Sequence, residues 1–255
     1  MQVTFLGTGT SGGVPLIGCG CEVCSSQNPK DKRLRTSIML EENSQTIVVD
    51  CGPDFRQQML REKVKSIDGI LFTHAHKDHT GGIDDIRSFN FMNKKPVDFY
   101  CDFATELGIK DQYSYAFSET DYPYLPKMNF HRINADKPFA IGTFQITPIQ
   151  VMHGSMPVLG FRFGKNFTYI TDAKTIAPKE REKIRGTKVL VLNALRHSEH
   201  YSHLTIEQAL EVVEDIQPET CYFTHMSHQF GLHDLMEKKL PPNIIIAYDG
   251  LKIEV

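Results

Sequence analysis

Short apolar runs recur along the whole chain, and their length of four to eight residues is typical of buried strands. The runs that predict strands are residues 3–7, 37–40, 46–50, 69–73, 97–101, 144–151, 160–163, 167–171, 188–193, 220–224 and 243–248. Helical periodicity fits residues 53–63, 178–185 and 205–216. Many strands with a few helices between them predict an α/β fold in which helices cover two sheets.

The helix at 205–216 has the clearest pattern. Thr205 precedes the sequence IEQALEVVEDI, and the apolar residues of that sequence form one stripe along a helix. A threonine in front of such a stripe is a favourable N-cap, so we expect the helix to begin directly after Thr205.

No stretch of the chain has the composition of a linker between domains. The 255 residues contain no Pro/Gly/Ser-rich linker, no internal repeat and no low-complexity tract. A chain of this length can bury one full hydrophobic core, so the sequence predicts a single domain over residues 1–255.

The composition narrows the class of protein. Hydrophobic residues make up 40% of the chain and charged residues 23%, and no run approaches the roughly 18 apolar residues of a membrane helix. The start MQVTFLGTGTSGG resembles a first strand rather than a secretion signal, so we expect a cytoplasmic protein without membrane contact. The net charge of -3 gives no general attraction for nucleic acid.

The densest group of candidate ligands is the segment THAHKDH at residues 73–79, directly behind an apolar run. His74 and His76 alternate, so in an extended segment both side chains project to one side, and Asp78 and His79 follow after the chain turns. This spacing suits two metal ions, one held by the first pair and the other by the second. The alternative, favoured for a lone HxH, is a solvated histidine-rich turn.

Three further candidate ligands follow later strands, namely His153, Asp172 and His225. Strand ends bring side chains from distant parts of a chain to a shared cleft. An aspartate between two cations can bridge them with one oxygen each, so the chain offers seven ligands for two ions. Two ions about 3.5–4 Å apart can lower the pKa of a shared water from 15.7 towards about 7. The crowding therefore predicts a site that generates hydroxide at neutral pH.

A second ligand group has the pattern CxCxxC. Cys19, Cys21 and Cys24 lie close together on one predicted loop, and three thiolates suit a structural zinc that lacks one ligand. Unpaired loop thiols or a redox pair are the alternatives. The remaining three cysteines lie in or beside apolar strands and are expected in the core.

These motifs resemble the metallo-β-lactamase superfamily along essentially the whole chain. VVDCGP (48–53) is similar to the strand-ending DxG of that superfamily, THAHKDH is similar to its HxHxDH, and the three later ligands follow in the same order. The resemblance implies an αββα four-layer sandwich with the site at one edge. It also implies that Asp50 orients the histidine loop, and the alternative is a turn-capping aspartate.

Finer motifs resemble the PhnP-type cyclic phosphodiesterases, relatives of the tRNA 3'-processing endonucleases. They are GTGTSGGVPLIGCGCEVC, DKRLRTS, SHLT (202–205) and THMSHQF (224–230). The resemblance implies that His203 contacts the phosphate and protonates the leaving oxygen, and that His228 completes the structural zinc. His197 and His200 share the loop with His203, but only His203 lies in the HxT pattern.

The leading hypothesis is hydrolysis of a small phosphodiester, such as a cyclic ribosyl phosphate, by a hydroxide between two metal ions. One ion would have the ligands His74, His76 and His153, the other Asp78, His79 and His225, with Asp172 bridging. Asp78 would orient the nucleophile, and His203 would protonate the departing alkoxide. The alternatives are a thioesterase or lactonase, a tRNA 3'-processing endonuclease, and a non-catalytic metal-binding relative.

The sequence defines the metal ions and the binding partners less closely than it defines the ligands. Histidine and aspartate ligands accept zinc, manganese or iron, and the resemblance implies manganese or zinc in the active site with one zinc at the cysteines. The expected partner is a small phosphodiester, nucleic acid is not expected, and a homodimer is compatible with the sequence. The aromatic segment 113–130 is either a substrate lid or, as we favour, a packed surface loop.

Overall fold

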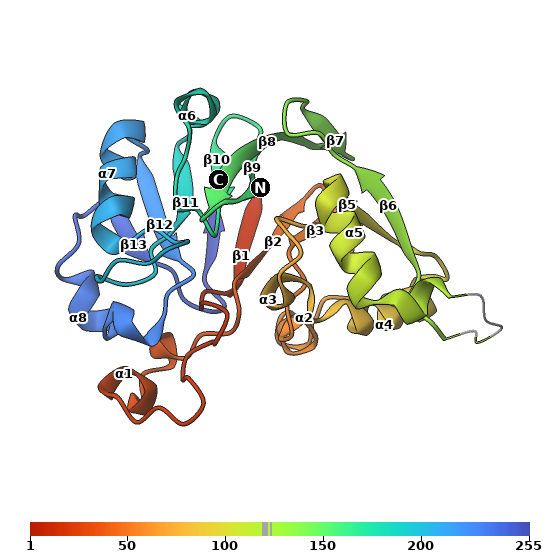
Figure 1. The fold of residues 1–255 in the computed structure, drawn as a ribbon, viewed down its shortest axis with the longest axis horizontal. Coiled ribbons are helices and arrows are strands. Elements are labelled where there is room, and N and C mark those ends of the chain that lie inside the picture. Colours follow the sequence, from red (N-terminus) through yellow and green to blue (C-terminus); the bar gives the residue numbers. More distant parts are fainter. Residues whose placement is uncertain (119–121, 123) are drawn as a thin grey trace.

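The computed structural model describes residues 1–118, 122 and 124–255, and within them the chain forms two seven-stranded sheets (Figure 1). The first sheet has the order β14-β1-β2-β3-β4-β5-β6. Its strands are β1 (Gln2–Gly7), β2 (Ser37–Glu42), β3 (Gln45–Val49), β4 (Gly69–Leu71), β5 (Val97–Cys101), β6 (Met128–Arg132) and β14 (Lys252–Glu254). Strands β3 to β6 run parallel, and β1, β2 and β14 are antiparallel to their neighbours.

The second sheet has the order β13-β12-β11-β10-β9-β8-β7. Its strands are β7 (Phe139–Ile141), β8 (Phe144–His153), β9 (Met156–Phe163), β10 (Phe167–Ile170), β11 (Val189–Asn193), β12 (Thr220–Thr224) and β13 (Ile244–Ile246). Strands β10 to β13 are parallel, whereas β7, β8 and β9 form antiparallel hairpins.

Helices cover the outer face of each sheet (Figure 1). The α-helices are α1 (Glu22–Ser25), α2 (Phe55–Glu62), α3 (Lys77–Thr80), α4 (Arg87–Asn93), α5 (Phe103–Gln112), α6 (Pro178–Ile184), α7 (Ile206–Ile216) and α8 (His233–Glu237). Short 3-10 turns lie at Pro29–Asp31, Ile83–Ile86, Ser114–Phe117 and His228–Phe230. None of the helices in the described residues is long and apolar enough to cross a membrane.

Three hydrophobic clusters define the layers. One lies between the sheets and includes Phe5, Phe161 and Val191. Another packs the first sheet against α2, α4 and α5, and the third packs the second sheet against α6, α7 and α8. The predicted αββα sandwich is therefore confirmed.

All predicted strands and helices are present, with ends shifted by a few residues. Helix α7 begins as expected: the Thr205 hydroxyl accepts a hydrogen bond from the Gln208 amide at 3.2 Å, and the Gln208 side chain accepts one from the Thr205 amide. The pattern missed the edge strands β6, β7 and β14, and also helices α1, α3, α4, α5 and α8.

We expect Phe161→Ala to lower the free energy of unfolding by about 3–5 kcal/mol, because the side chain is fully buried between the sheets and its loss leaves a cavity. Urea unfolding measures the change. Phe91→Ala removes an equal ring from a site that is 78% exposed, so it should change stability by less than about 0.5 kcal/mol. Equal effects of the two variants would contradict the assigned layers.

Candidate metal centre

Three candidate ligand or support residues lie where strands end in the left-handed backbone conformation. Asp50 follows β3, Asp172 follows β10 and Thr171, and His225 follows β12. Their φ angles are +66°, +58° and +57°. This conformation is unfavourable for residues other than glycine, and the surrounding structure must hold it. Such strained positions concentrate at functional sites, so we take this edge of the sandwich as the candidate functional site.

The histidine loop lies between β4 and α3. His74 is buried, His76 is exposed at the surface, and Asp78 and His79 lie in the single turn of α3. The ring centroids of His74 and His79 are 4.2 Å apart, so the turn folds the two ends of the motif onto each other. The segment therefore presents four candidate ligands within a small volume.

Asp172 lies between two sets of histidines. Its Oδ2 is 3.9 Å from Nε2 of His74 and 3.9 Å from Nε2 of His153. Its Oδ1 is 3.4 Å from Nε2 of His79 and 3.2 Å from Nδ1 of His225. Each carboxylate oxygen thus faces a different ligand set, as a bridging carboxylate must.

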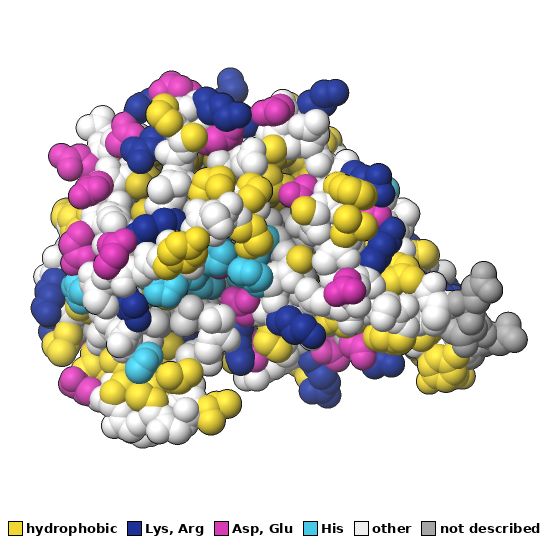
Figure 2. All heavy atoms as spheres, viewed as in Figure 1, with side chains coloured by type: hydrophobic (Ala, Val, Ile, Leu, Met, Phe, Trp, Pro, Cys, Tyr) yellow, Lys and Arg dark blue, Asp and Glu magenta, His cyan; other side chains and the backbone are white. Residues whose placement is uncertain are grey.

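The structure brings together all seven residues expected from the sequence. His74, His76 and His153 form one group of ligand atoms within 4.8 Å of one another, and Asp78, Asp172 and His225 form another. His79 joins His74 and Asp172 in a third overlapping group. Figure 2 shows histidine side chains gathered in the middle of one face of the molecule.

Asp50 lies directly behind the histidine loop. Its Oδ2 is 2.7 Å from Nδ1 of His79, and its Oδ1 accepts the Thr73 amide at 2.9 Å. A carboxylate at this distance fixes the Nδ1–H tautomer of His79, which leaves Nε2 with a free lone pair that points into the cluster. The geometry is that of a residue that orients a ligand.

His79 provides the test of whether metal ions fit. Its buried Nε2 makes no hydrogen bond within the described chain, although it lies 3.2 Å from Asp78. Burial favours the neutral ring, but Asp172 and Asp50 outweigh it and raise the pKa of His79 well above its ordinary value. The carboxylates around this buried imidazole favour a positive charge at Nε2, which either a proton on His79 or a divalent ion can supply.

Burial and neighbouring charges also shift the pKa values of His74 and Asp172. Burial lowers the pKa of His74 well below its usual value. Burial would raise the pKa of Asp172, but His225 and His79 hold it well below the usual range. His74 is therefore a neutral imidazole and Asp172 an ionised carboxylate, the forms that bind metals.

His203 lies over the ligand cluster. It is 7% exposed, and its ring stacks on His225 with centroids 4.8 Å apart and meets His153 edge-on at 4.6 Å. Burial, with a further contribution from His225, lowers the pKa of His203 to about 2. The ring is thus a neutral imidazole in direct contact with two candidate ligands.

The two competing histidines of that loop are placed differently. His197 is exposed and pairs with Glu207 at 2.8 Å. His200 contacts the His203 ring with centroids 5.0 Å apart. Of the three, His203 has the closest contacts with the cluster.

The cysteine loop and His228 meet at a second candidate metal site. Nδ1 of His228 lies 3.4 Å from the sulfur of Cys19 and 3.3 Å from that of Cys21, and Cys24 completes the group. The contact with His228 lowers the pKa of Cys21 to about 6, whereas burial raises the pKa of Cys24 to about 11. Three sulfurs and one imidazole nitrogen are a donor set that zinc takes in tetrahedral sites.

Several contacts of the cluster were not expected from the sequence. The Thr73 hydroxyl lies within hydrogen-bond distance of Asp50, His74 and His79. Thr10 places its hydroxyl 3.3 Å from Nε2 of His225, so the GTGTSGG turn lines the site. Threonine is common in strands and turns, and only its place in these motifs could have marked either residue.

The aromatic segment 113–130 packs on its own half of the molecule. The Tyr113 hydroxyl donates to the Thr80 carbonyl at 2.8 Å, Tyr115 bonds to Asp84, and Phe117 contacts Phe130. Residues 119–121 and 123 lie outside the described residues. These contacts fit the packed loop better than the lid.

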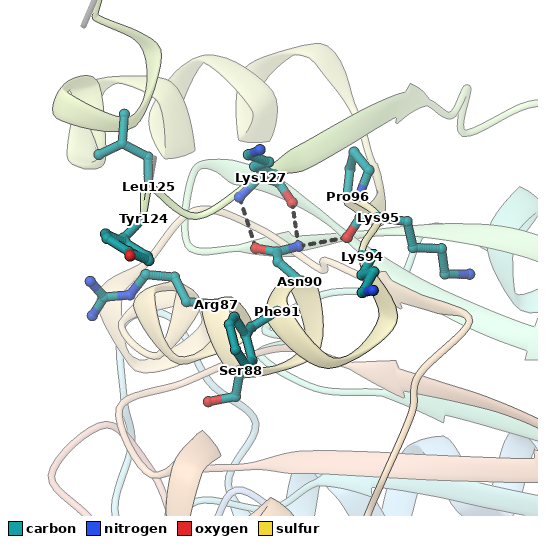
Figure 3. A pocket seen from close by; sticks show the side chains of 10 residues that line it. All are labelled: Arg87, Ser88, Asn90, Phe91, Lys94, Lys95, Pro96, Tyr124, Leu125 and Lys127. Carbon is teal, nitrogen blue, oxygen red and sulfur yellow. Dashed lines mark hydrogen bonds between the residues drawn. The ribbon is translucent and has the colours of Figure 1, made fainter. Parts of the chain in front are cut away.

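A hollow of about 870 Å³ lies between α4 and residues 124–127 (Figure 3). Asn90 fixes its floor by hydrogen bonds with Lys95 and Lys127. Among the residues that the structure describes, no candidate metal ligand lines this hollow, so the volume of a hollow does not by itself identify the site.

Comparisons with known proteins agree with this geometry. The family described as Beta-lactamase superfamily domain matches residues 45–226. A crystal structure described as a new diphosphatase from the PhnP family is 37% identical, covers 100% of this chain and 97% of its own, and superimposes with a TM-score of 0.93.

Two curated relatives are longer than this chain. An octanoyltransferase of Porphyromonas gingivalis is 39% identical over 254 residues, which are 99% of this chain and 51% of the relative. A ribonuclease Z of Methanococcus maripaludis is 28% identical over 170 residues, 64% of this chain and 48% of the relative. The chain thus spans about half the length of these relatives.

The chain belongs to the metallo-β-lactamase superfamily and, within it, to the PhnP family. Its family and the candidate metal ligands at its site are those expected of a metal-dependent hydrolase.

We expect Asp50→Ala to weaken metal binding about 10- to 100-fold, because His79 would lose the carboxylate that orients it. Competition with a chelating dye measures the affinity. Asp98→Ala is the matched control, since Asp98 of β5 also contacts a histidine, His131 of β6 at 2.7 Å, in a partly exposed pair away from the cluster. Unchanged affinity in Asp50→Ala would exclude the orienting role.

We expect His228→Ala to lose one zinc per chain and to keep the active-site metals, because His228 contacts only the cysteine group. Elemental analysis after gel filtration gives the stoichiometry. His197→Ala, which removes an exposed histidine, should keep every ion. A metal content that is the same in wild type and His228→Ala would rule out this site.

Proposed function

We propose that the protein hydrolyses a small phosphodiester. The observation that carries the proposal is the position of Asp172, whose two oxygens face the His74/His153 and the His79/His225 sets, with His203 packed over both. A displacement at phosphorus needs a nucleophile on one side, charge neutralisation around phosphorus and a proton for the leaving oxygen. This cluster offers residues for all three.

Two divalent ions would be held by the seven ligands, with Asp172 shared between the two sets. They would supply a water of lowered pKa and neutralise the charge that develops on the phosphate oxygens. Manganese or zinc both suit histidine and aspartate ligands, and the cysteine group suits zinc.

The chain's own residues have separate tasks in this proposal. Asp78, whose Oδ2 lies 3.2 Å from Nε2 of His79, helps to orient the attacking water. Asp50 keeps His79 in the tautomer that offers Nε2. A ring nitrogen of His203 passes a proton to the leaving oxygen. The anionic diester beside the ring would raise the pKa that burial lowers in the free protein, and the low exposure of His203 keeps bulk water away from that proton.

The PhnP-family diphosphatase supports chemistry at phosphorus. The ribonuclease Z relatives support it as well, but a folded RNA needs a surface to grip. The turn between β8 and β9, which follows His153, contains only residues 154 and 155, and the chain has a net charge of -3. A small substrate therefore fits this chain better than a tRNA precursor.

Thioester hydrolysis is a second candidate, because this chain matches about half of a relative named octanoyltransferase. The same nucleophile could attack a carbonyl carbon. A parallel assay of bis(p-nitrophenyl) phosphate, an octanoyl thioester and a lactone with manganese- and zinc-loaded protein distinguishes the two. Turnover of the thioester alone would replace the phosphodiester proposal.

We expect His203→Ala to retain its metals and to lose about 10²- to 10⁴-fold in kcat on a diester with a poor leaving group, because the leaving oxygen would lack its proton donor. Steady-state kinetics and elemental analysis on one preparation test this. His197→Ala, in the same loop but paired with Glu207, should keep full activity. A normal kcat in metal-loaded His203→Ala would remove the proton-donor role.

A further inference from the structure

Tyr201 is an exposed aromatic residue beside the metal cluster. It lies in the loop between β11 and α7, two residues before His203, and 76% of it is exposed, whereas His203 is 7% exposed. No hydrogen bond and no ring contact of Tyr201 occurs with the part of the chain that the structure describes. Within the described residues, neither a hydrogen bond nor a contact between rings therefore accounts for an aromatic residue at this position.

The ring nevertheless lies against the residue that follows a candidate ligand. One side of the ring covers Gly154: a Cβ at Gly154 would lie 2.5 Å from Cε1 and 3.1 Å from Cζ of Tyr201. Gly154 has φ +61° and directly follows the candidate ligand His153. The next residue of the loop, Ser202, accepts a hydrogen bond from Nδ1 of His153 at 2.9 Å. The tyrosine thus lies beside the candidate ligand His153, at the rim of the site.

The charges around Tyr201 indicate what the rim could bind. Lys174 is engaged by Glu199 and Gln208, and Arg196 by Gln229 and backbone carbonyls. Neither cation is free for a second phosphate group. The ring of Tyr201 is flat, uncharged and mostly exposed. Such a ring can stack against a planar group of the substrate that lies next to the reacting phosphate.

We propose that Tyr201 is a stacking platform for a nucleobase, and that the substrate is a nucleotide-containing phosphodiester. This inference rests on the proposed phosphodiesterase function and names its substrate class. Stacking of a base on an aromatic side chain is sequence-tolerant and adds affinity without touching the reacting atoms. Tyr201 is therefore a specificity residue and takes no part in the bond cleavage.

The test compares two diesters with the same leaving group, thymidine 5'-(p-nitrophenyl phosphate) and methyl p-nitrophenyl phosphate, on metal-loaded protein. Tyr201→Ala should lower kcat/KM for the thymidine ester about 5- to 100-fold, mainly through KM, and change that for the methyl ester less than about twofold. Tyr201→Phe should behave as wild type. Tyr201→Leu, which keeps bulk over Gly154 without an aromatic face, should behave as Tyr201→Ala.

Tyr124→Ala is the matched control, because it removes a tyrosine of similar exposure, 63%, at the hollow beside α4. It should leave both substrates unaffected. An equal loss on both diesters in Tyr201→Leu, or no loss on either, would overturn the stacking role. Loss of metal from Tyr201→Leu would also overturn it, since the side chain would then support His153. If wild type cleaves neither diester but cleaves a thioester, the proposed function itself fails.

Discussion

The carboxylate of Asp172 is the contact on which the arrangement of the molecule depends. Each of its two oxygens faces one histidine from the first sheet and one from the second. The loop after β4 supplies His74 and His79, while β8 and the end of β12 supply His153 and His225. The sandwich therefore brings both sheets together at one edge, and the hydrophobic cluster between them fixes the distance across the site.

The backbone conformation at this edge of the sandwich serves the same need to place ligands at the cluster. Asp50, Asp172 and His225 each turn away from a strand in a conformation that glycine adopts more readily. A glycine would relieve the strain but would provide no carboxylate or imidazole. The surrounding hydrogen bonds, such as those of Asp50 with Thr73 and His79, hold the conformation in its place. The positions with a strained backbone are thus the positions that provide the ligands and their support.

The sequence predicted the sandwich and its candidate ligands because both have local signals. Buried strands such as β11 are continuous apolar runs, and the ligands are rare residue types at their ends. Helix α4 lacks such a signal, since Phe91 and Met92 are exposed, and edge strand β14 is only three residues long. The left-handed φ angles and the contacts of Thr73 and Tyr201 depend on packing between distant segments, so no local pattern reveals them.

The candidate ligands are spread over the chain from His74 to His225, and no short segment holds a complete set. In the unfolded chain these side chains are dispersed, so an ion that binds the native cluster has little affinity for the denatured ensemble. By mass action, each tenfold excess of free ion over its dissociation constant then adds about 1.4 kcal/mol to the native state. The concentration of free metal ion therefore helps to determine the fraction of the protein that is folded.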